Sequence, residues 1–205
     1  DKNNFYDHLE TIKDIYVLPE NAQFEIQEDL ELENSFLYVG SGSNLFFRPL
    51  VRMQVDTIVA NGSGFTRSGD LTPWYGIKAK NVIFNNVTIS GTTNTEESAL
   101  NIQDSVLSVL NNVNFETNHS HILIKNSNVI ANNLSFDSTY WYRSPDWAIN
   151  ISNSRAKINN LECKNVVTCI VSNDSRVELD NVSATDVKSQ IFQVYGENSF
   201  FSLGT

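Results

Sequence analysis

Apolar and polar residues alternate along most of this chain, and a pair of asparagines interrupts the alternation at intervals. Residues 81–91 read NVIFNNVTISG, with Val82 and Phe84 before the pair and Val87 and Ile89 after it. Alternation with a period of two indicates β-strands in which every second side chain faces a core. Asparagine is a poor strand former. A pair of them inside such a pattern therefore needs a structural reason.

The pattern recurs along the chain with a common period. If the second residue of each pair is taken as the mark, the marks are Asn86, Asn112, Asn133, Asn160 and Asn181. Their spacings are 26, 21, 27 and 21 residues. A second mark is the serine that ends motifs such as LNIQDS and ILIKNS. It runs in step with the first, with spacings of 22, 27 and 21 residues, at Ser105, Ser127, Ser154 and Ser175. Two marks that share one period indicate an internal repeat.

The repeat predicts an all-β solenoid. Strand–turn–strand units of 21–27 residues cannot bury an apolar face alone, but stacked units share one continuous core. We therefore predict a parallel β-helix, right-handed because parallel crossovers strongly favour that hand. In this fold the marked asparagines lie at corners, since asparagine tolerates left-handed backbone geometry and bonds its own turn. Stacked copies are expected to form a ladder of side-chain amides.

The repeat also predicts the organisation of the chain as a single domain. Residues 1–23 lack the repeat and are expected to be an N-terminal cap or lead-in, with a candidate helix at residues 5–14. Residues 24–205 are expected to form the β-helix. The two longer spacings indicate insertions at residues 91–98 and 138–147.

Charge and hydropathy exclude several classes of partner. The net charge is −10 and the pI is about 4.6, which disfavours nucleic acids and anionic membrane surfaces. No apolar run approaches the roughly 20 residues needed to span a bilayer. The first residue is Asp, so we expect a processed chain or an excised segment.

The cysteines and the glycosylation sequons bear on the compartment. Cys163 and Cys169 flank one turn, so they form either a disulfide or two buried free thiols. Asn-x-Ser/Thr sequons make surface asparagines candidate glycan acceptors in a secreted protein. The seven sequons are at Asn61, Asn86, Asn118, Asn133, Asn150, Asn173 and Asn181.

The second insertion is the candidate ligand-binding site. It contains four aromatic residues within eight positions, namely Tyr140, Trp141, Tyr142 and Trp147. Such rings stack on sugars or anchor protein partners. Trp74 joins them if its coil edge lies on the same side. The alternative is that the loop folds back over the solenoid and buries its own rings.

The sequence gives little support for catalysis. Asp104 and Asp174 occupy similar turn positions, but three coils separate them, roughly 14 Å at about 4.8 Å per coil. That distance is too long for the carboxylate pair of a glycosidase. His119 and His121 supply at most half of a metal site. We therefore expect no catalytic residue, no metal and no cofactor.

The repeats, the asparagine corners and the Asn/Ser/Thr-rich faces resemble the right-handed parallel β-helix superfamily, with its pectin-lyase-like architecture. That superfamily includes pectate-lyase-like enzymes, phage tailspikes and the passenger regions of secreted adhesins and autotransporters. The resemblance covers roughly residues 24–203 and is architectural, so it transfers no catalytic residue. Within the superfamily the chain is more similar to adhesin or surface-filament segments, because its coils have sparse charge and no acidic or basic cluster.

This resemblance implies a non-enzymatic protein, secreted or at the cell surface, that acts as an adhesin, stalk or filament subunit. The expected partners are glycans or proteins of a host or self surface. The alternative is a carbohydrate-active enzyme, or an inactive relative that still binds glycan. The last coil, SFFSLGT, has no obvious polar cap. We therefore also expect a longer parent chain or end-to-end self-association.

Overall fold

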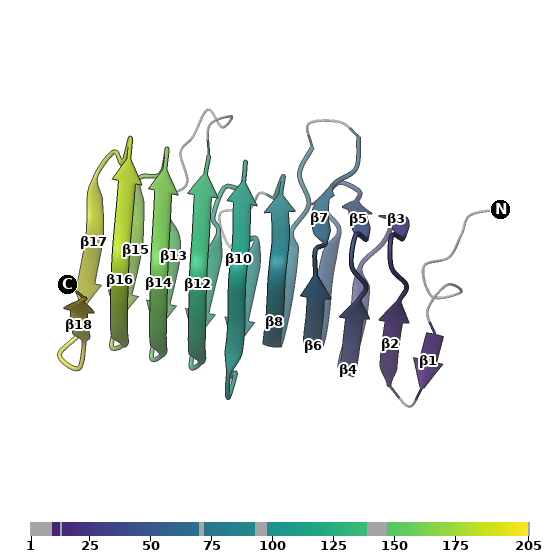
Figure 1. The fold of residues 1–205 in the computed structure, drawn as a ribbon, viewed down its shortest axis with the longest axis horizontal. Helices are drawn as coiled ribbons and strands as arrows, with labels where there is room; N and C mark the ends of the chain where they lie inside the picture. Colours follow the sequence, from purple (N-terminus) through teal and green to yellow (C-terminus); the bar gives the residue numbers. More distant parts are fainter. Residues whose placement is uncertain (1–9, 13, 70–71, 93–97, 139–146, 205) are drawn as a thin grey trace.

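The chain folds as a stack of β-coils (Figure 1). The computed structural model describes residues 10–12, 14–69, 72–92, 98–138 and 147–204. Within these ranges there are 18 strands and no helix, and every strand pairing except β1–β2 is parallel. The predicted all-β parallel β-helix is therefore confirmed. None of the described residues belongs to a helix with the length and apolar character needed to cross a membrane.

The strands have the following bounds. They are β1 (Glu10–Ile12), β2 (Ile15–Leu18), β3 (Gln23–Ile26), β4 (Leu30–Val39), β5 (Asn44–Phe47), β6 (Arg52–Asn61), β7 (Gly64–Arg67), β8 (Gly76–Ser90), β9 (Leu100–Gln103), β10 (Ser108–Glu116), β11 (Ile122–Lys125), β12 (Asn128–Asp137), β13 (Trp147–Ser152), β14 (Arg155–Lys164), β15 (Thr168–Asn173), β16 (Arg176–Thr185), β17 (Gln190–Tyr195) and β18 (Phe200–Leu203).

The registers divide the solenoid into three faces. The first face stacks β2, the ends of β4 and β6, and the parts of β8, β10, β12, β14 and β16 that precede the marked asparagines. The second face stacks β3, β5 and β7, followed by the parts of the long strands after those asparagines. The third face stacks the starts of β4, β6 and β8 below β9, β11, β13, β15 and β17.

A single apolar core runs along the axis inside these faces. On the first face Phe84, Leu110, Ala131, Ile158 and Leu179 lie in register, and each is at most 1% exposed. On the second face the rings of Phe115 and Phe136 stack with centroids 5.0 Å apart. Because a fully buried aliphatic or aromatic side chain contributes about 1.5–3 kcal/mol, these columns are the main source of stability.

Buried serines close the corner between the third and first faces. The backbone N–H of Ser105 donates to Ser127 Oγ, that of Ser127 to Ser154 Oγ, and that of Ser154 to Ser175 Oγ, at 3.0–3.1 Å. The Ser127, Ser154 and Ser175 hydroxyls in turn donate to the carbonyl two residues earlier. The second sequence mark is thus a hydrogen-bonded column that satisfies backbone groups at a bend.

The N-terminal end differs from the sequence prediction. The candidate helix at residues 5–14 is wrong for its described part, because Glu10–Ile12 forms β1, which pairs antiparallel with β2. The parallel stack already begins with β2, which pairs with β4, within the segment that was assigned to a lead-in. The physical reason is the open edge of β2, whose backbone groups need partners.

The two ends of the stack are covered to different extents. In the first coil the inward side chains of Leu18, Leu30 and Leu32 are at most 2% exposed. In the last coil the inward residues Val194 and Leu203, which stack on Ser172 and Leu179, are 44% and 58% exposed. The described part of the core is therefore better covered at its N-terminal end, where the inward Tyr16 and Phe24 are half-buried, than at its C-terminal end.

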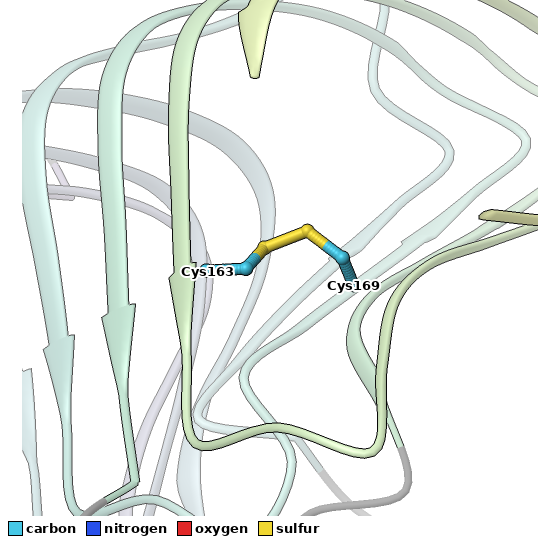
Figure 2. The surroundings of a disulfide bond; sticks show 2 residues. All are labelled: Cys163 and Cys169. Atoms are coloured by element: carbon cyan, nitrogen blue, oxygen red, sulfur yellow. A yellow bond between two sulfur atoms is a disulfide. The ribbon is translucent and has the colours of Figure 1, made fainter. Parts of the chain in front are cut away.

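A disulfide joins Cys163 at the end of β14 to Cys169 in β15, across the turn between these strands (Figure 2). Both cysteines are fully buried, and the alternative of two free thiols does not hold for this structure. The bond fixes a corner between the second and third faces. It is compatible with an extracellular location, since disulfides persist in oxidising compartments.

Candidate functional site: a groove along the asparagine ladder

The five marked asparagines form a ladder parallel to the solenoid axis. Each has a positive φ, between 52° and 56°, which lets the chain turn from the first face to the second without a break in the strand. From Asn112 onward, each side-chain amide donates to the asparagine of the preceding coil. The bonds run from Asn112 Nδ2 to Asn86 Oδ1 (3.0 Å), from Asn133 to Asn112 (2.6 Å), from Asn160 to Asn133 (2.7 Å) and from Asn181 to Asn160 (3.0 Å).

A second column of asparagines precedes this ladder by one residue, and our sequence reasoning missed it. Asn61, Asn85, Asn111, Asn132 and Asn159 lie in register. Within this column Asn85 Nδ2 donates to Asn61 Oδ1 (3.0 Å), Asn132 to Asn111 (2.8 Å) and Asn159 to Asn132 (2.7 Å). The signal was present in the sequence as a repeated residue type at a constant offset from the marks.

A groove of about 730 Å³ runs beside the marked ladder on the second face. The surface is hollowed here because four of the five outward residues that follow the corners are short, namely Thr88, Asn114, Ser135 and Ser183; the fifth is Glu162. Among the residues lining the groove, Glu162 alone carries a charge. The groove is therefore a polar and nearly neutral surface that spans five coils.

The ladder leaves hydrogen-bonding capacity that a ligand can use. An asparagine amide has two N–H donors and an oxygen with two lone pairs, and an interior rung uses one donor and one acceptor within the ladder. One N–H and one lone pair per rung are left, repeated about every 4.8 Å along the axis. This arrangement suits an extended ligand with many hydroxyl groups.

The aromatic candidates do not form one site. The prediction for Trp74 is wrong, because its side chain is fully buried, stacks on Phe47 with centroids 4.0 Å apart, and donates from Nε1 to the Ser90 carbonyl (2.9 Å). Trp147 is half-buried at the start of β13, in register with Thr168. Tyr140, Trp141 and Tyr142 lie outside the described residues.

The structure also separates the glycosylation candidates. Asn118 is fully buried, and its side chain accepts from the Thr92 backbone and hydroxyl and donates to the Ile89 carbonyl. This position is therefore excluded as a glycan acceptor in the folded chain. Asn150 is half-buried. The exposed sequon asparagines are Asn61, Asn86, Asn133, Asn173 and Asn181.

His121 is the one fully buried histidine among the described residues. Its Nε2 lies 2.9 Å from Ser138 Oγ, and its ring packs against those of Phe115 and Phe136. Burial lowers the pKa of His121 to about 3, against an opposing effect of Asp137, and His119 lowers it further. A neutral, packed imidazole has a structural role. The described residues contain no cluster of three or more metal-ligating side chains.

We compared the chain with protein-family models, with curated proteins and with solved structures, and none of the three comparisons gave a match. The fold alone therefore defines the class of this protein. Its parallel strands, stacked coil upon coil, make it a parallel β-solenoid.

Proposed function

We propose that this chain is a non-enzymatic β-helix protein, secreted or at the cell surface, which acts as an adhesin, stalk or filament subunit and binds neutral glycan. The observation that supports this most strongly is the groove beside the asparagine ladder. Its neutral amides and hydroxyls repeat at coil spacing, and they match the hydroxyl groups of a sugar chain better than they match a charged polymer.

Two further observations support the proposal. The buried disulfide suits an oxidising compartment, and the continuous core gives a rigid rod that can hold a binding face away from a surface. The similarity to adhesins and to pectin-lyase-like architecture belongs to this proposal, because it rests on repeats and corners rather than on a family match.

The groove favours binding over hydrolysis. A glycosidase uses two facing carboxylates about 5–10 Å apart, whereas Glu162 is the single carboxylate among the groove-lining residues. We therefore prefer glycan binding to the alternative of a carbohydrate-active enzyme.

The test is a glycan-array experiment with a blocked groove. Ser135→Trp places a large ring on the groove floor, and Ser152→Trp is the matched control, because Ser152 points outward on the third face of the same coil. We expect the wild type and Ser152→Trp to bind the same glycans and Ser135→Trp to lose at least ten-fold in affinity. Equal binding by both variants, or no binding by the wild type, would contradict the groove as the binding site.

The aromatic insertion is tested in the same assay. We propose that Trp141 adds a stacking contact to sugars, because an aromatic ring packs well against the apolar face of a sugar. Replacement by alanine would remove this contact. Trp141→Ala is then expected to weaken glycan binding several-fold with no change in melting temperature. A lower melting temperature with unchanged binding would show instead that the ring covers the solenoid.

A further inference from the structure

Three cationic side chains lie together where the third face turns into the first, toward the C-terminal end of the stack. Arg155 and Lys157 are exposed outward residues at the start of β14, and Arg176 is the exposed first residue of β16. Arg155 and Arg176 are in register on neighbouring strands (Figure 1). We call these three residues the basic corner. No basic cluster is apparent in the sequence, because the two arginines are 21 positions apart, and the expectation of none is wrong at this corner.

The basic corner lacks carboxylate partners for two of its cations. Elsewhere on the surface cations are commonly paired, as Arg48 is with Glu25 (3.1 Å). Among the described residues, no partner forms an ion pair or a hydrogen bond with the side chain of Arg155 or Lys157. The chain has 24 acidic and 14 basic residues. Two adjacent unpaired cations on so acidic a chain indicate that an anion comes from outside.

Arg176 is held in place before any ligand arrives. Its Nε donates to Glu178 Oε1 (2.9 Å), and its Nη2 lies 2.8 Å from the same oxygen. Its guanidinium also lies over the ring of Phe200, 4.9 Å from the centroid. A guanidinium has five N–H donors, so three remain for a ligand. A long side chain that is already ordered lowers the entropy cost of binding.

Both arginines line a hollow of about 750 Å³ at this corner. Asn153 lines it as well, is exposed, and makes no side-chain hydrogen bond with a described residue. One coil earlier, Asn126 donates from Nδ2 to Asp104 Oδ1 (3.0 Å) and has its own oxygen available. The hollow therefore combines two guanidinium groups with unused amide donors and acceptors.

One carboxylate, that of Asp174, also lines the hollow. Its Oδ1 lies against the last coil, so close to Gly196 that a β-carbon on this glycine would collide with it. Arg155 and Arg176 outnumber Asp174, and the lining residues therefore have a net charge of +1 on a chain with a net charge of −10. The hollow attracts anions on a molecule that otherwise repels them.

We propose that the basic corner binds a sulfate monoester carried by a sugar. A sulfate ester has three terminal oxygens, so two guanidinium groups can donate to two of its edges, whereas a carboxylate offers one such edge. Neighbouring strands are about 4.8 Å apart, which lets two arginines in register reach one tetrahedral group. A phosphate monoester has the same shape, but its charge of about −1.5 to −2 is repelled more strongly by Asp174, Glu178 and the whole chain.

The remainder of the hollow accounts for the sugar. Its volume is much larger than a sulfate group needs, and the amides of Asn126 and Asn153 suit the hydroxyl groups of a sugar ring. This site is distinct from the groove beside the asparagine ladder, which lies past another corner, on the second face. The proposal rests on the arginines and goes beyond the binding of neutral glycan.

The test compares four forms of one polymer by biolayer interferometry on the whole chain. These are dextran sulfate, dextran phosphate, carboxymethyl dextran and unmodified dextran, with the first three matched in degree of substitution and all measured at one ionic strength. The site variants are Arg155→Gln and Arg155→Lys. Arg48→Gln is the matched control, because it changes the net charge equally at an exposed arginine outside the hollow. Ser135→Trp, which blocks the groove, is measured beside them.

We expect dextran sulfate to bind at least ten-fold more tightly than the other three polymers. Arg155→Gln should weaken this binding at least ten-fold, and Arg155→Lys several-fold, because lysine keeps the charge but loses the planar fork. Arg48→Gln and Ser135→Trp should bind dextran sulfate within two-fold of the wild type. Melting temperatures should agree for the wild type and both Arg155 variants, since this side chain has no partner among the described residues.

Several results would overturn the proposal. They are the absence of dextran sulfate binding, equal binding of the phosphate or carboxymethyl polymer, and an equal loss in Arg48→Gln, which would indicate unspecific attraction. Loss of dextran sulfate binding in Arg155→Gln with neutral-glycan binding unchanged concerns this corner alone, and the reverse pattern in Ser135→Trp concerns the groove alone.

Competition identifies what carries the sulfate. Galactose 6-sulfate is expected to displace dextran sulfate at a concentration at least ten-fold lower than sodium sulfate or a sulfotyrosine peptide. Equal displacement by sodium sulfate would show that the sugar is not recognised. Better displacement by the peptide would assign the corner to a protein partner, and either result would overturn the proposal.

Discussion

Asparagine at each corner combines a backbone role with a side-chain role. Its left-handed φ turns the chain, and its amide links one coil to the next. A non-glycine residue in the left-handed region costs about 1–2 kcal/mol, which asparagine reduces through local hydrogen bonds. Asparagine therefore suits the corner mainly through its backbone conformation. The groove follows from the ladder that the stacked corners form.

This combination can be separated at Asn133. Asn133→Ala loses both ladder bonds and the tolerance for positive φ, so we expect it to lower the free energy of unfolding by about 2–3 kcal/mol. Asn133→Gly loses the same bonds but keeps the backbone geometry, and should cost less than the alanine variant. Urea unfolding of the three proteins measures both values. If glycine were the more harmful substitution, the φ argument would be wrong.

His121 makes stability depend on pH. The native chain holds this imidazole neutral down to about pH 3, while the unfolded chain takes up a proton below its ordinary pKa of about 6.5. The unfolded state therefore binds more protons between these values, and stability falls as pH falls below about 6.5.

The slope reaches about 1.4 kcal/mol per pH unit below about pH 6 and is small above pH 7, so the total loss of stability between pH 7.5 and pH 5 is about 2 kcal/mol. Urea unfolding at the two pH values measures it. His121→Gln serves as the comparison, because it removes the titrating group and should show a smaller loss over the same interval. An identical pH dependence in both proteins would show that other groups cause the change.

At the scale of elements, the disulfide fixes one turn between strands. Cys163 and Cys169 close a loop of six residues' separation, for which chain entropy gives about 2 kcal/mol. We expect Cys163→Ser/Cys169→Ser to lower the free energy of unfolding by that amount or more, since two hydroxyls replace buried sulfurs. Thermal unfolding of wild type under oxidising and reducing conditions gives an independent measure. No difference between these conditions would contradict a stabilising bond.

The repeats made the elements of the solenoid predictable. Every marked asparagine and serine recurs with one period, so the stacking, the corners and the two insertions could be inferred without coordinates. The register of outward residues from coil to coil could not be inferred as readily, because the coils have unequal lengths. The one-residue insertion at Val106, for example, shifts the turn but leaves the later register intact.

The two wrong predictions, Trp74 as a ligand-binding residue and the helix at residues 5–14, share one cause. Trp74 and β1 lie where the period-two pattern is broken, and there the sequence does not reveal which side of the chain faces the core. Trp74 is inward and stacks on Phe47, although two aromatics in TPWYG suggested a ligand site. Residues 10–12 join a sheet edge, although their local pattern suggested a helix. In both cases contacts with distant residues, rather than the local sequence, determine the conformation.

At the scale of the whole molecule, stability should be graded along the axis. In a solenoid each coil contacts only its neighbours, and the last coil covers its core on one side alone. We expect amide hydrogens of β17 and β18 to exchange at least ten-fold faster than those of β12 and β14, which lie between two coils. Hydrogen-exchange mass spectrometry measures the difference. Uniform exchange along the stack would show that the last coil is covered in solution.

The ladder bonds also have a direction, because every donor lies on the later coil and every acceptor on the earlier one. The amide dipoles therefore align along the axis, with their oxygens toward the C-terminal end. At Asn181 the side-chain oxygen is an acceptor that faces the C-terminal end. In the neighbouring column of asparagines, Asn159 is followed by Asp180, a carboxylate that cannot donate to Asn159 Oδ1. The stack is thus a polar rod with two unlike poles, because the ladder presents amide oxygens toward its C-terminal end and N–H groups toward its N-terminal end.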